Sequence, residues 1–311
     1  MTIICNTDNI PENIKNPVVT IGNFDGVHCA HQTIFSEVTK RADDIKGTSA
    51  AITFEPHPLK VISPEKFKPL ITTLEQKKEL VAEQGLDILL VIDFTPKFRS
   101  IAAKEFVQNI LVRRLGIREI VVGYDYAFGN KREGNIDLLK EMGVHYNFNV
   151  IQMEPVRIGE TLVSSTSIRN LITEGNISEA NRLLGRNYQI RGEVVEGKNR
   201  GKSLLGYATA NLKTDNGLMP REGVYIVAVE LEGKVYQGLT NIGRNPTFKN
   251  KALSVETHLL DLSTNILNQR IKVNFLARLR DEITFDEAGE LSRQISKDIE
   301  QASKFFKRNN L

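Results

Sequence analysis

The strongest constraint on this chain's fold is a change of pattern near residue 185. Before this point, short apolar runs alternate with amphipathic helical patterns, which is typical of a parallel sheet covered on both faces. After it, strand-like runs follow one another with Gly- and Asn-containing turns and no long helices between them, which is typical of an antiparallel sheet or small barrel. The sequence therefore predicts two domains, residues 1–185 and 186–311.

For the first domain we expect an α/β fold with a doubly wound parallel sheet. Its predicted strands are 18–21, 50–54, 88–92, 120–122 and 149–151, and its predicted helices are 31–42, 73–84 and 103–115. Ligands of such sheets bind at the carboxyl ends of the strands. Residues 22–31 and 123–129 each follow a predicted strand, so we expect a site there.

For the second domain we expect an antiparallel β-barrel with a terminal helix. Its predicted strands are 189–195, 224–230, 235–240, 255–260 and 271–276. Thr284 and Glu287 have the spacing of a capping box. An apolar stripe follows, which we expect to pack on the barrel: Ala288, Leu291, Ile295, Ile299 and Ala302.

Composition excludes several other classes of protein. The 41 basic and 38 acidic residues give a net charge of +3 and are interspersed, whereas a nucleic-acid binder usually concentrates its positive charge in a patch. No apolar run approaches the roughly 18 residues of a membrane span, and residues 1–17 lack the pattern of a signal peptide. Two cysteines fit a reducing compartment. We therefore expect a cytoplasmic protein without nucleic-acid or membrane partners, and we find no sequence feature that indicates an oligomeric state.

The segment Gly22–His31 has the character of a phosphate site. Glycines at positions 22 and 26 allow backbone N–H groups to approach a ligand closely. His28 and His31 lie three residues apart at a predicted helix start, where they can donate hydrogen bonds. Two other interpretations stay open from spacing alone: the histidines could cap the helix, or together with Cys29 they could bind a metal.

Two further segments suit phosphate chemistry. The hydroxyls of residues 164–167 precede Arg169, and hydroxyls at a helix N-terminus with an arginine one turn later can clamp an anion. The basic segment 197–212 is rich in glycine, including Gly201 and Gly206, whose backbone N–H groups can approach phosphates. It ends in Thr209-Ala210-Asn211, where a hydroxyl and an amide can hold Mg²⁺. Alone, each segment could be a helix cap or a surface turn.

Together, these segments resemble the bacterial FAD synthetases, the bifunctional riboflavin kinase/FMN adenylyltransferases. Gly-x-Phe-Asp-Gly-x-His-x-x-His at 22–31 resembles the His-x-Gly-His motif of the nucleotidyltransferase superfamily. The resemblance spans about eight ordered motifs along nearly the whole chain, which is far more specific than any one motif. The motifs in the first domain are 22–31, 53–58, 123–134 and 164–169, and those in the second are 206–211, 220–225, 241–248 and 255–258.

For the first domain, the resemblance implies an FMN adenylyltransferase with a nucleotidyltransferase-like fold. His28, His31 and Arg169 would be catalytic. The implied ATP- and phosphate-binding residues are Gly22, Phe24, Asp25, Gly26, Ser164, Ser165 and Thr166, and the implied flavin-binding residues are Asp125, Phe128, Gly129 and Arg132. Ala30 stands where the motif has glycine.

For the second domain, the resemblance implies a riboflavin kinase. Glu256 would be the general base, Thr209 and Asn211 would hold Mg²⁺ with ATP, and Gly201 and Gly206 would meet phosphates. Ala208 replaces the motif's proline, and 265–268 departs from the family pattern where flavin contacts are expected. The expected substrates and products are ATP, riboflavin, FMN, FAD and pyrophosphate, with no tightly bound prosthetic group. A flavin- or nucleotide-binding regulator without turnover is the competing hypothesis.

Overall fold

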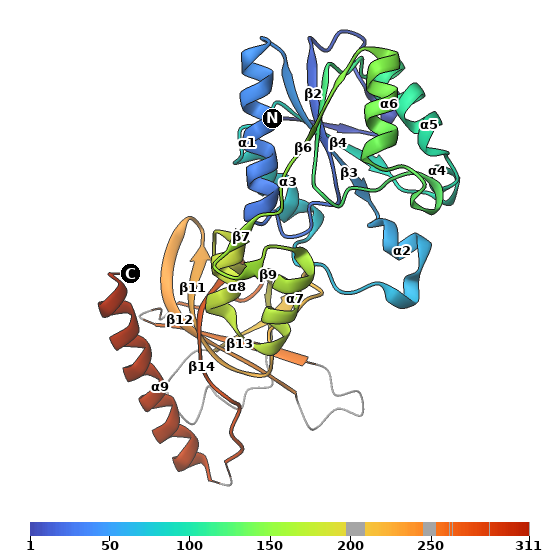
Figure 1. Ribbon diagram of the computed structural model, residues 1–311. Coiled ribbons are helices and arrows are strands. Elements are labelled where there is room, and N and C mark those ends of the chain that lie inside the picture. The colour runs from blue at the N-terminus through green and yellow to red at the C-terminus, as the bar shows by residue number, and fades with distance from the viewer. Residues whose placement is uncertain (197–208, 245–252, 261, 263, 286, 311) are drawn as a thin grey trace. The chain divides into compact units, whose positions relative to one another are not determined.

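The computed structural model describes residues 1–311 except 197–208, 245–252, 261, 263, 286 and 311 (Figure 1). The chain divides into two compact units, Met1–Ser165 and Thr166–Leu311. The predicted domain boundary at 185/186 stays a prediction. No helix within the described ranges is long and apolar enough to cross a membrane.

The first unit contains a six-stranded sheet in the order β1-β4-β3-β2-β5-β6, with every neighbouring pair parallel. The predicted parallel sheet is therefore confirmed. The sequence analysis missed β1, an edge strand in which only Ile4 is buried, so it lacks a continuous apolar run. The strands are β1 (Thr2–Cys5), β2 (Pro17–Ile21), β3 (Thr48–Glu55), β4 (Ile88–Asp93), β5 (Glu119–Val122) and β6 (Asn149–Gln152).

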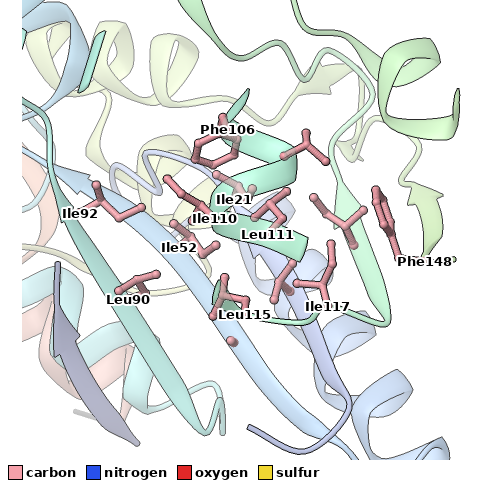
Figure 2. Packing of buried hydrophobic residues seen from close by; sticks show 14 of the residues in the cluster. Ile21, Ile52, Leu90, Ile92, Phe106, Ile110, Leu111, Leu115, Ile117 and Phe148 are labelled. Carbon is pink, nitrogen blue, oxygen red and sulfur yellow. The ribbon is translucent and has the colours of Figure 1, made fainter. Parts of the chain in front are cut away.

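Helices cover both faces of this sheet, as Figure 1 shows. On one face, α1 (Cys29–Asp44) and α3 (Leu74–Ala82) pack on the strands through buried side chains that include Phe35, Val38 and Val81. The other face is covered by α5 (Ala103–Phe106), the π-helix η3 (Val107–Arg114) and α6 (Ile136–Tyr146), and Figure 2 shows the packing of Phe106, Ile110 and Leu111 there. The short elements of this unit are η1 (Thr7–Asn9), α2 (Pro58–Ile62), η2 (Pro64–Lys66), α4 (Pro96–Arg99), η4 (Asn130–Arg132), β7 (Arg157–Ile158) and β8 (Thr161–Leu162).

The second unit contains a closed barrel of six antiparallel strands in the order β10-β13-β12-β11-β14-β9. Large aromatic side chains that include Tyr188, Tyr225 and Phe275 are fully buried and contact one another. The predicted barrel is thus confirmed, with β10 as an additional strand in a segment expected to be a loop. The strands are β9 (Tyr188–Val195), β10 (Thr209–Thr214), β11 (Gly223–Leu231), β12 (Lys234–Arg244), β13 (Leu253–Leu259) and β14 (Arg270–Arg280).

Three helices complete the second unit: α7 (Ser165–Glu174), which begins at the last residue of the first unit, α8 (Ile177–Leu184) and α9 (Ala288–Asn309). The predicted terminal helix lies along the outside of the barrel (Figure 1). Its Ala302 and Phe306 side chains pack with Leu239 and Val224 of the barrel. The predicted capping box is wrong. Glu287 immediately precedes the helix and makes no side-chain capping bond, so Thr284 lies too far upstream to cap it.

Two candidate active sites

The first candidate site lies where the order of strands in the parallel sheet reverses direction. β2 and β5 are neighbours, and the chain continues from β2 to β3 on one side and from β5 to β6 on the other. The predicted segments 22–31 and 123–129 follow these two strands. Ligands of doubly wound sheets bind outside the carboxyl ends of the strands at such a point. The topology therefore brings the two predicted segments to one edge of the sheet.

The loop between β2 and α1 is tightly wound. Phe24, Gly26 and Val27 all have positive φ angles, of 48°, 86° and 41°. At Gly22, an added Cβ would lie 2.8 Å from Cε1 of the Phe24 ring, so the close approach of this ring requires glycine. These positive φ angles wind the chain tightly at the end of β2, where residues 24–28 are buried and Gly22 and Asn23 are more exposed.

Hydrogen bonds to two other segments, residues 71–72 and Ser165, hold this loop in place. The Asp25 carboxylate, 3% exposed, accepts hydrogen bonds from the backbone N–H groups of Ile71 (2.9 Å) and Thr72 (3.3 Å). Gly26 N donates to Thr72 Oγ1 at 3.1 Å, and Ser165 Oγ donates to the Asp25 carbonyl at 2.9 Å. The structure thus gives Asp25 and Ser165 roles in shaping the loop, while their predicted contacts with ATP stay predictions.

The two predicted catalytic histidines lie together at the start of α1. His28 is the residue before the helix and is 4% exposed, and its ring stacks on His31 with 3.6 Å between centroids and 16° between planes. The Phe24 ring contacts His31 edge-on, with 5.3 Å between centroids. Imidazole N–H groups held in this way can donate hydrogen bonds to phosphate oxygens. Within the described ranges, no group of three or more His, Cys, Asp and Glu side chains could hold a metal.

The predicted flavin segment forms a small hairpin beyond β5. Phe128 and Gly134 exchange two backbone hydrogen bonds of 3.0 and 2.9 Å. The half-buried Phe128 ring stacks on Tyr126, and Asp125 and Arg132 are exposed. Gly129 has φ of 74°, and an added Cβ would lie 2.6 Å from Cβ of Ala103, so only glycine fits. An aromatic ring can stack on a flavin ring, and an exposed arginine can bind its phosphate. The assignment of these residues to flavin binding stays a prediction.

The remaining predicted residues of this site lie near the start of α7. Ser164 and Ser165 belong to the first unit, whereas Thr166 and Arg169 belong to the second. Ser165 reaches the loop through its bond to Asp25. The part that Ser164, Thr166 and Arg169 take in this site therefore stays a prediction.

The second candidate site lies on the outer face of the barrel. On β13, Val255, Thr257 and Leu259 are buried, and Glu256 between them is half-buried, so it points the other way. Glu256 pairs with Asn211 on β10 and with Asn241 on β12. Directly paired residues of antiparallel strands share a face of the sheet. Asn211, Glu256 and Asn241 therefore form one polar row.

The Glu256 carboxyl lies in an unusual electrostatic environment. Burial raises its pKa, and the negative charge of Glu282 raises it further. An added Cβ at Gly243 would lie 2.2 Å from Oε1 of Glu282, which places this carboxylate directly against β12. A carboxyl with a raised pKa is suited to general-base work near neutral pH. The sequence analysis predicted Glu256 as a site residue and did not predict Glu282 or Asn241. Asn241 is the first residue of the family motif 241–248, so that motif could have identified it.

The polar row fits the predicted magnesium. Mg²⁺ prefers oxygen ligands, and Asn211 presents an amide on the face of the barrel that also carries the Glu256 carboxylate. Thr209 is the first residue of β10, opposite His258, which places its backbone two residues from Asn211. Gly201 and Gly206 lie outside the described residues, so their predicted phosphate contacts stay predictions.

The switch-point loop (residues 22–31) carries a stacked histidine pair, and the barrel carries a carboxylate with a raised pKa. Together they indicate an enzyme with two sites, each of which transfers a group from a nucleotide. Two family models match the chain: FAD synthetase over residues 10–167 and riboflavin kinase over residues 184–306. The chain belongs to the family of bifunctional riboflavin kinase/FMN adenylyltransferases.

Relatives from three bacteria carry that name. One from Buchnera aphidicola (Acyrthosiphon pisum) is 37% identical, with 98% of each chain covered. One from Listeria monocytogenes is 36% identical, with 94% of this chain and 93% of the relative covered. One from Escherichia coli K12 is 33% identical, with 93% and 92% covered.

A solved structure shares the fold. It is described as a macrolide-efflux protein from Streptococcus pneumoniae and is 32% identical, with a TM-score of 0.88 over 97% of this chain and 99% of that chain. Its printed name differs from that of the family, whereas both family models and the three relatives agree with one another.

Proposed function

We propose that this chain makes FAD from riboflavin in two ATP-dependent steps, with the polar row on the barrel serving the first step and the switch-point loop the second. The observation that carries this proposal is that hydrogen-bonding residues of the family motifs lie against one another within each unit. Support comes from the stacked His28 and His31 in the first unit and from the paired Glu256 and Asn211 in the second.

In the first step, Glu256 accepts the proton of the riboflavin 5′-hydroxyl. The hydroxyl oxygen forms a bond to the γ-phosphorus of ATP, the bond from this phosphorus to the bridging oxygen breaks, and ADP leaves. The raised pKa of Glu256 makes its carboxylate a stronger base than an ordinary one. Thr209 and Asn211 would hold Mg²⁺, which neutralises charge on the phosphates when bound.

In the second step, an oxygen of the FMN phosphate attacks the α-phosphorus of ATP in line, and pyrophosphate leaves without a covalent enzyme intermediate. This transfer depends on alignment and charge neutralisation more than on proton movement. His28, His31 and Arg169 would donate hydrogen bonds to the phosphate oxygens as negative charge builds up on them. Gly22, Phe24 and Gly26 would present the loop backbone to the same phosphates.

Product chromatography tests both steps. Purified protein is incubated with riboflavin, ATP and Mg²⁺, and separately with FMN, ATP and Mg²⁺. We expect FMN followed by FAD in the first mixture and FAD in the second, and we expect chelation of the metal to stop both reactions. Bound flavin or ATP without product in either mixture would favour the regulator hypothesis instead.

The His28→Ala variant tests the switch-point site. We expect FAD formation from FMN to fall by at least about 100-fold, because a group that stabilises the transition state is removed. Riboflavin phosphorylation by the same preparation serves as the internal control and should be unchanged. Full FAD formation by this variant would contradict the assignment of His28.

The Glu256→Gln variant tests the polar row. We expect riboflavin phosphorylation to fall by at least about 100-fold, because glutamine keeps the shape of the side chain and cannot accept the proton. Adenylylation of supplied FMN should be retained. Loss of both activities would show that the substitution had damaged the fold rather than removed a base.

We also infer that the protein works in the cytoplasm. Cys5 and Cys29 are both free thiols, and Cys5 is exposed, which suits a reducing compartment.

A further inference from the structure

The first unit contains a buried lysine that the two reactions do not use. Lys77 lies in the first half of α3 and is 2% exposed. Burying an ammonium group is costly unless it is paired, and a positive charge near a helix N-terminus is also unfavourable. Lys78, the next residue, shows the ordinary alternative, since it forms a surface ion pair of 2.8 Å with Glu75.

Hydrogen bonds connect Lys77 to the switch-point loop. Its Nζ lies 3.4 Å from Oγ1 of Thr53, a fully buried residue of β3. The Thr53 hydroxyl in turn donates to the carbonyl of Asn23 at 3.3 Å. The ammonium is therefore linked, through one hydroxyl, to the backbone of the loop that precedes the histidine pair.

Charge connects Lys77 to the same loop by a second route. Burial lowers the pKa of Lys77, and the carboxylates of Asp25 and Glu55 act in the opposite direction. Asp25 is itself buried and holds the backbone of Ile71 and Thr72, just before α3 begins. Lys77 is thus the nearby positive charge that offsets a carboxylate on which the shape of the loop depends.

We propose that Lys77 is a positioning residue for adenylyl transfer, holding residues 23–26 in the conformation that presents the loop and His28 to the phosphates of ATP. It contacts no reacting atom and acts through Thr53 and Asp25. This inference rests on the proposed second step.

The test compares Lys77→Met with Lys78→Met as a matched control on the same helix. The kinetics of FMN adenylylation are measured with ATP and FMN varied in turn, and riboflavin phosphorylation is measured on each preparation. We expect Lys77→Met to lower kcat/KM for ATP by about 10- to 100-fold with a raised KM for ATP, because small misplacements of binding groups are costly. The KM for FMN should stay within about twofold, since the hairpin at 123–134 has no bond to Lys77 among those described here.

The outcomes separate positioning from a purely structural role. If Lys77→Met lowers kcat alone and leaves both KM values unchanged, the variant has only lost active protein and the proposal is overturned. An unchanged kcat/KM for ATP overturns it as well. We further expect Lys77→Arg, which keeps the charge, to recover part of the loss, and Lys78→Met to behave as the unaltered protein.

Thr53→Val covers the case in which Lys77→Met fails to fold, recognised by a changed circular-dichroism spectrum. Thr53→Val keeps the side-chain shape and breaks the hydrogen-bonded link, so it should raise the KM for ATP, and an unchanged value overturns the proposal. Asp25→Asn added to Lys77→Met removes the unbalanced carboxylate and should restore part of kcat/KM. If the unaltered protein forms no FAD from FMN, the proposed second step fails before Lys77 is tested.

Discussion

At the scale of single residues, the carboxylates of Glu256 and Glu282 lie close enough to interact electrostatically. The pKa of Glu256 is raised by burial and then by the charge of Glu282. In the proposed kinase step the base form of Glu256 is the active one, so riboflavin phosphorylation should rise with pH as this carboxyl loses its proton. The midpoint of that rise should lie above the ordinary range of a glutamate.

The Glu282→Gln variant isolates the second cause. Removing the negative charge makes ionisation of Glu256 easier, so its pKa falls and the acid limb of the kinase pH profile should move to lower pH. The measurement is kcat/KM for riboflavin across the acid range. An acid limb that stays in place would show that burial alone raises the pKa. FMN adenylylation should keep its own pH profile.

Motifs supplied the candidate residues for chemistry, because glycines, histidines and the Thr-x-Asn segment are unusual in their spacing, and the roles of these residues stay predictions. They did not predict Lys77 or Glu282. In the sequence, Lys77 is one of two adjacent lysines on an amphipathic helix, and only the packing of α3 against β3 shows that one is buried and the other is not. Such contacts join residues distant along the chain, as Thr53 and Lys77 do, and local pattern does not contain them.

At the scale of secondary-structure elements, one buried ion pair joins α9 to the barrel. The guanidinium of Arg280 on β14 binds Asp298 on α9 through Nε and Nη2, at 3.0 and 2.7 Å. Gln294 donates a further bond of 2.9 Å to the same carboxylate. Asp298 is 3% exposed, so this contact is shielded from water.

The Asp298→Asn variant should destabilise the barrel. Removing one partner of a buried pair leaves the other charge uncompensated, and we expect a loss of about 3 kcal/mol in the free energy of unfolding. Urea unfolding followed by circular dichroism measures it, with kinase activity reporting on the barrel. Glu300→Gln, which alters an exposed pair with Lys304 on the same helix, is the matched control and should leave the unfolding midpoint unchanged.

Continuously apolar strands could be predicted from the sequence. A strand that forms only because neighbouring strands pair with it, and the type of a helix, could not. β2 to β5 were found because strands buried on both faces are continuously apolar, and β6, an edge strand without a fully buried residue, was found from its Val150-Ile151 pair. β10 begins in a segment of Gly, Lys and Thr and is a strand because β9 and β13 flank it. The predicted helix 103–115 becomes π-helical from Val107 onward, and its apolar periodicity alone does not distinguish the two helix types.

At the scale of the whole molecule, the histidine pair and Glu256 belong to different compact units, and FMN is the product of the kinase reaction and the substrate of the adenylyltransferase reaction. We expect FMN to be released and bound again. A mixture of His28→Ala and Glu256→Gln should then convert riboflavin to FAD, with a lag while FMN accumulates. Each variant alone should fail. The measurement is product chromatography over time, and a mixture that forms FMN without FAD would show that free FMN does not reach the second site.

The alternation along β13 has an evolutionary consequence. Its odd-numbered positions, 255, 257 and 259, fill the barrel, and Glu256 between them faces outward. Selection for a folded protein acts on the first set, and selection for phosphate chemistry acts on the second. Positions 255 and 259 can drift among apolar side chains of similar volume, and Thr257 is held by the 3.0 Å hydrogen bond between its hydroxyl and that of Thr240. On the proposed role of Glu256, position 256 has no such freedom. Neighbouring codons of β13 should therefore change at different rates. A lineage that lost the kinase reaction could lose Glu256 and still keep the barrel intact.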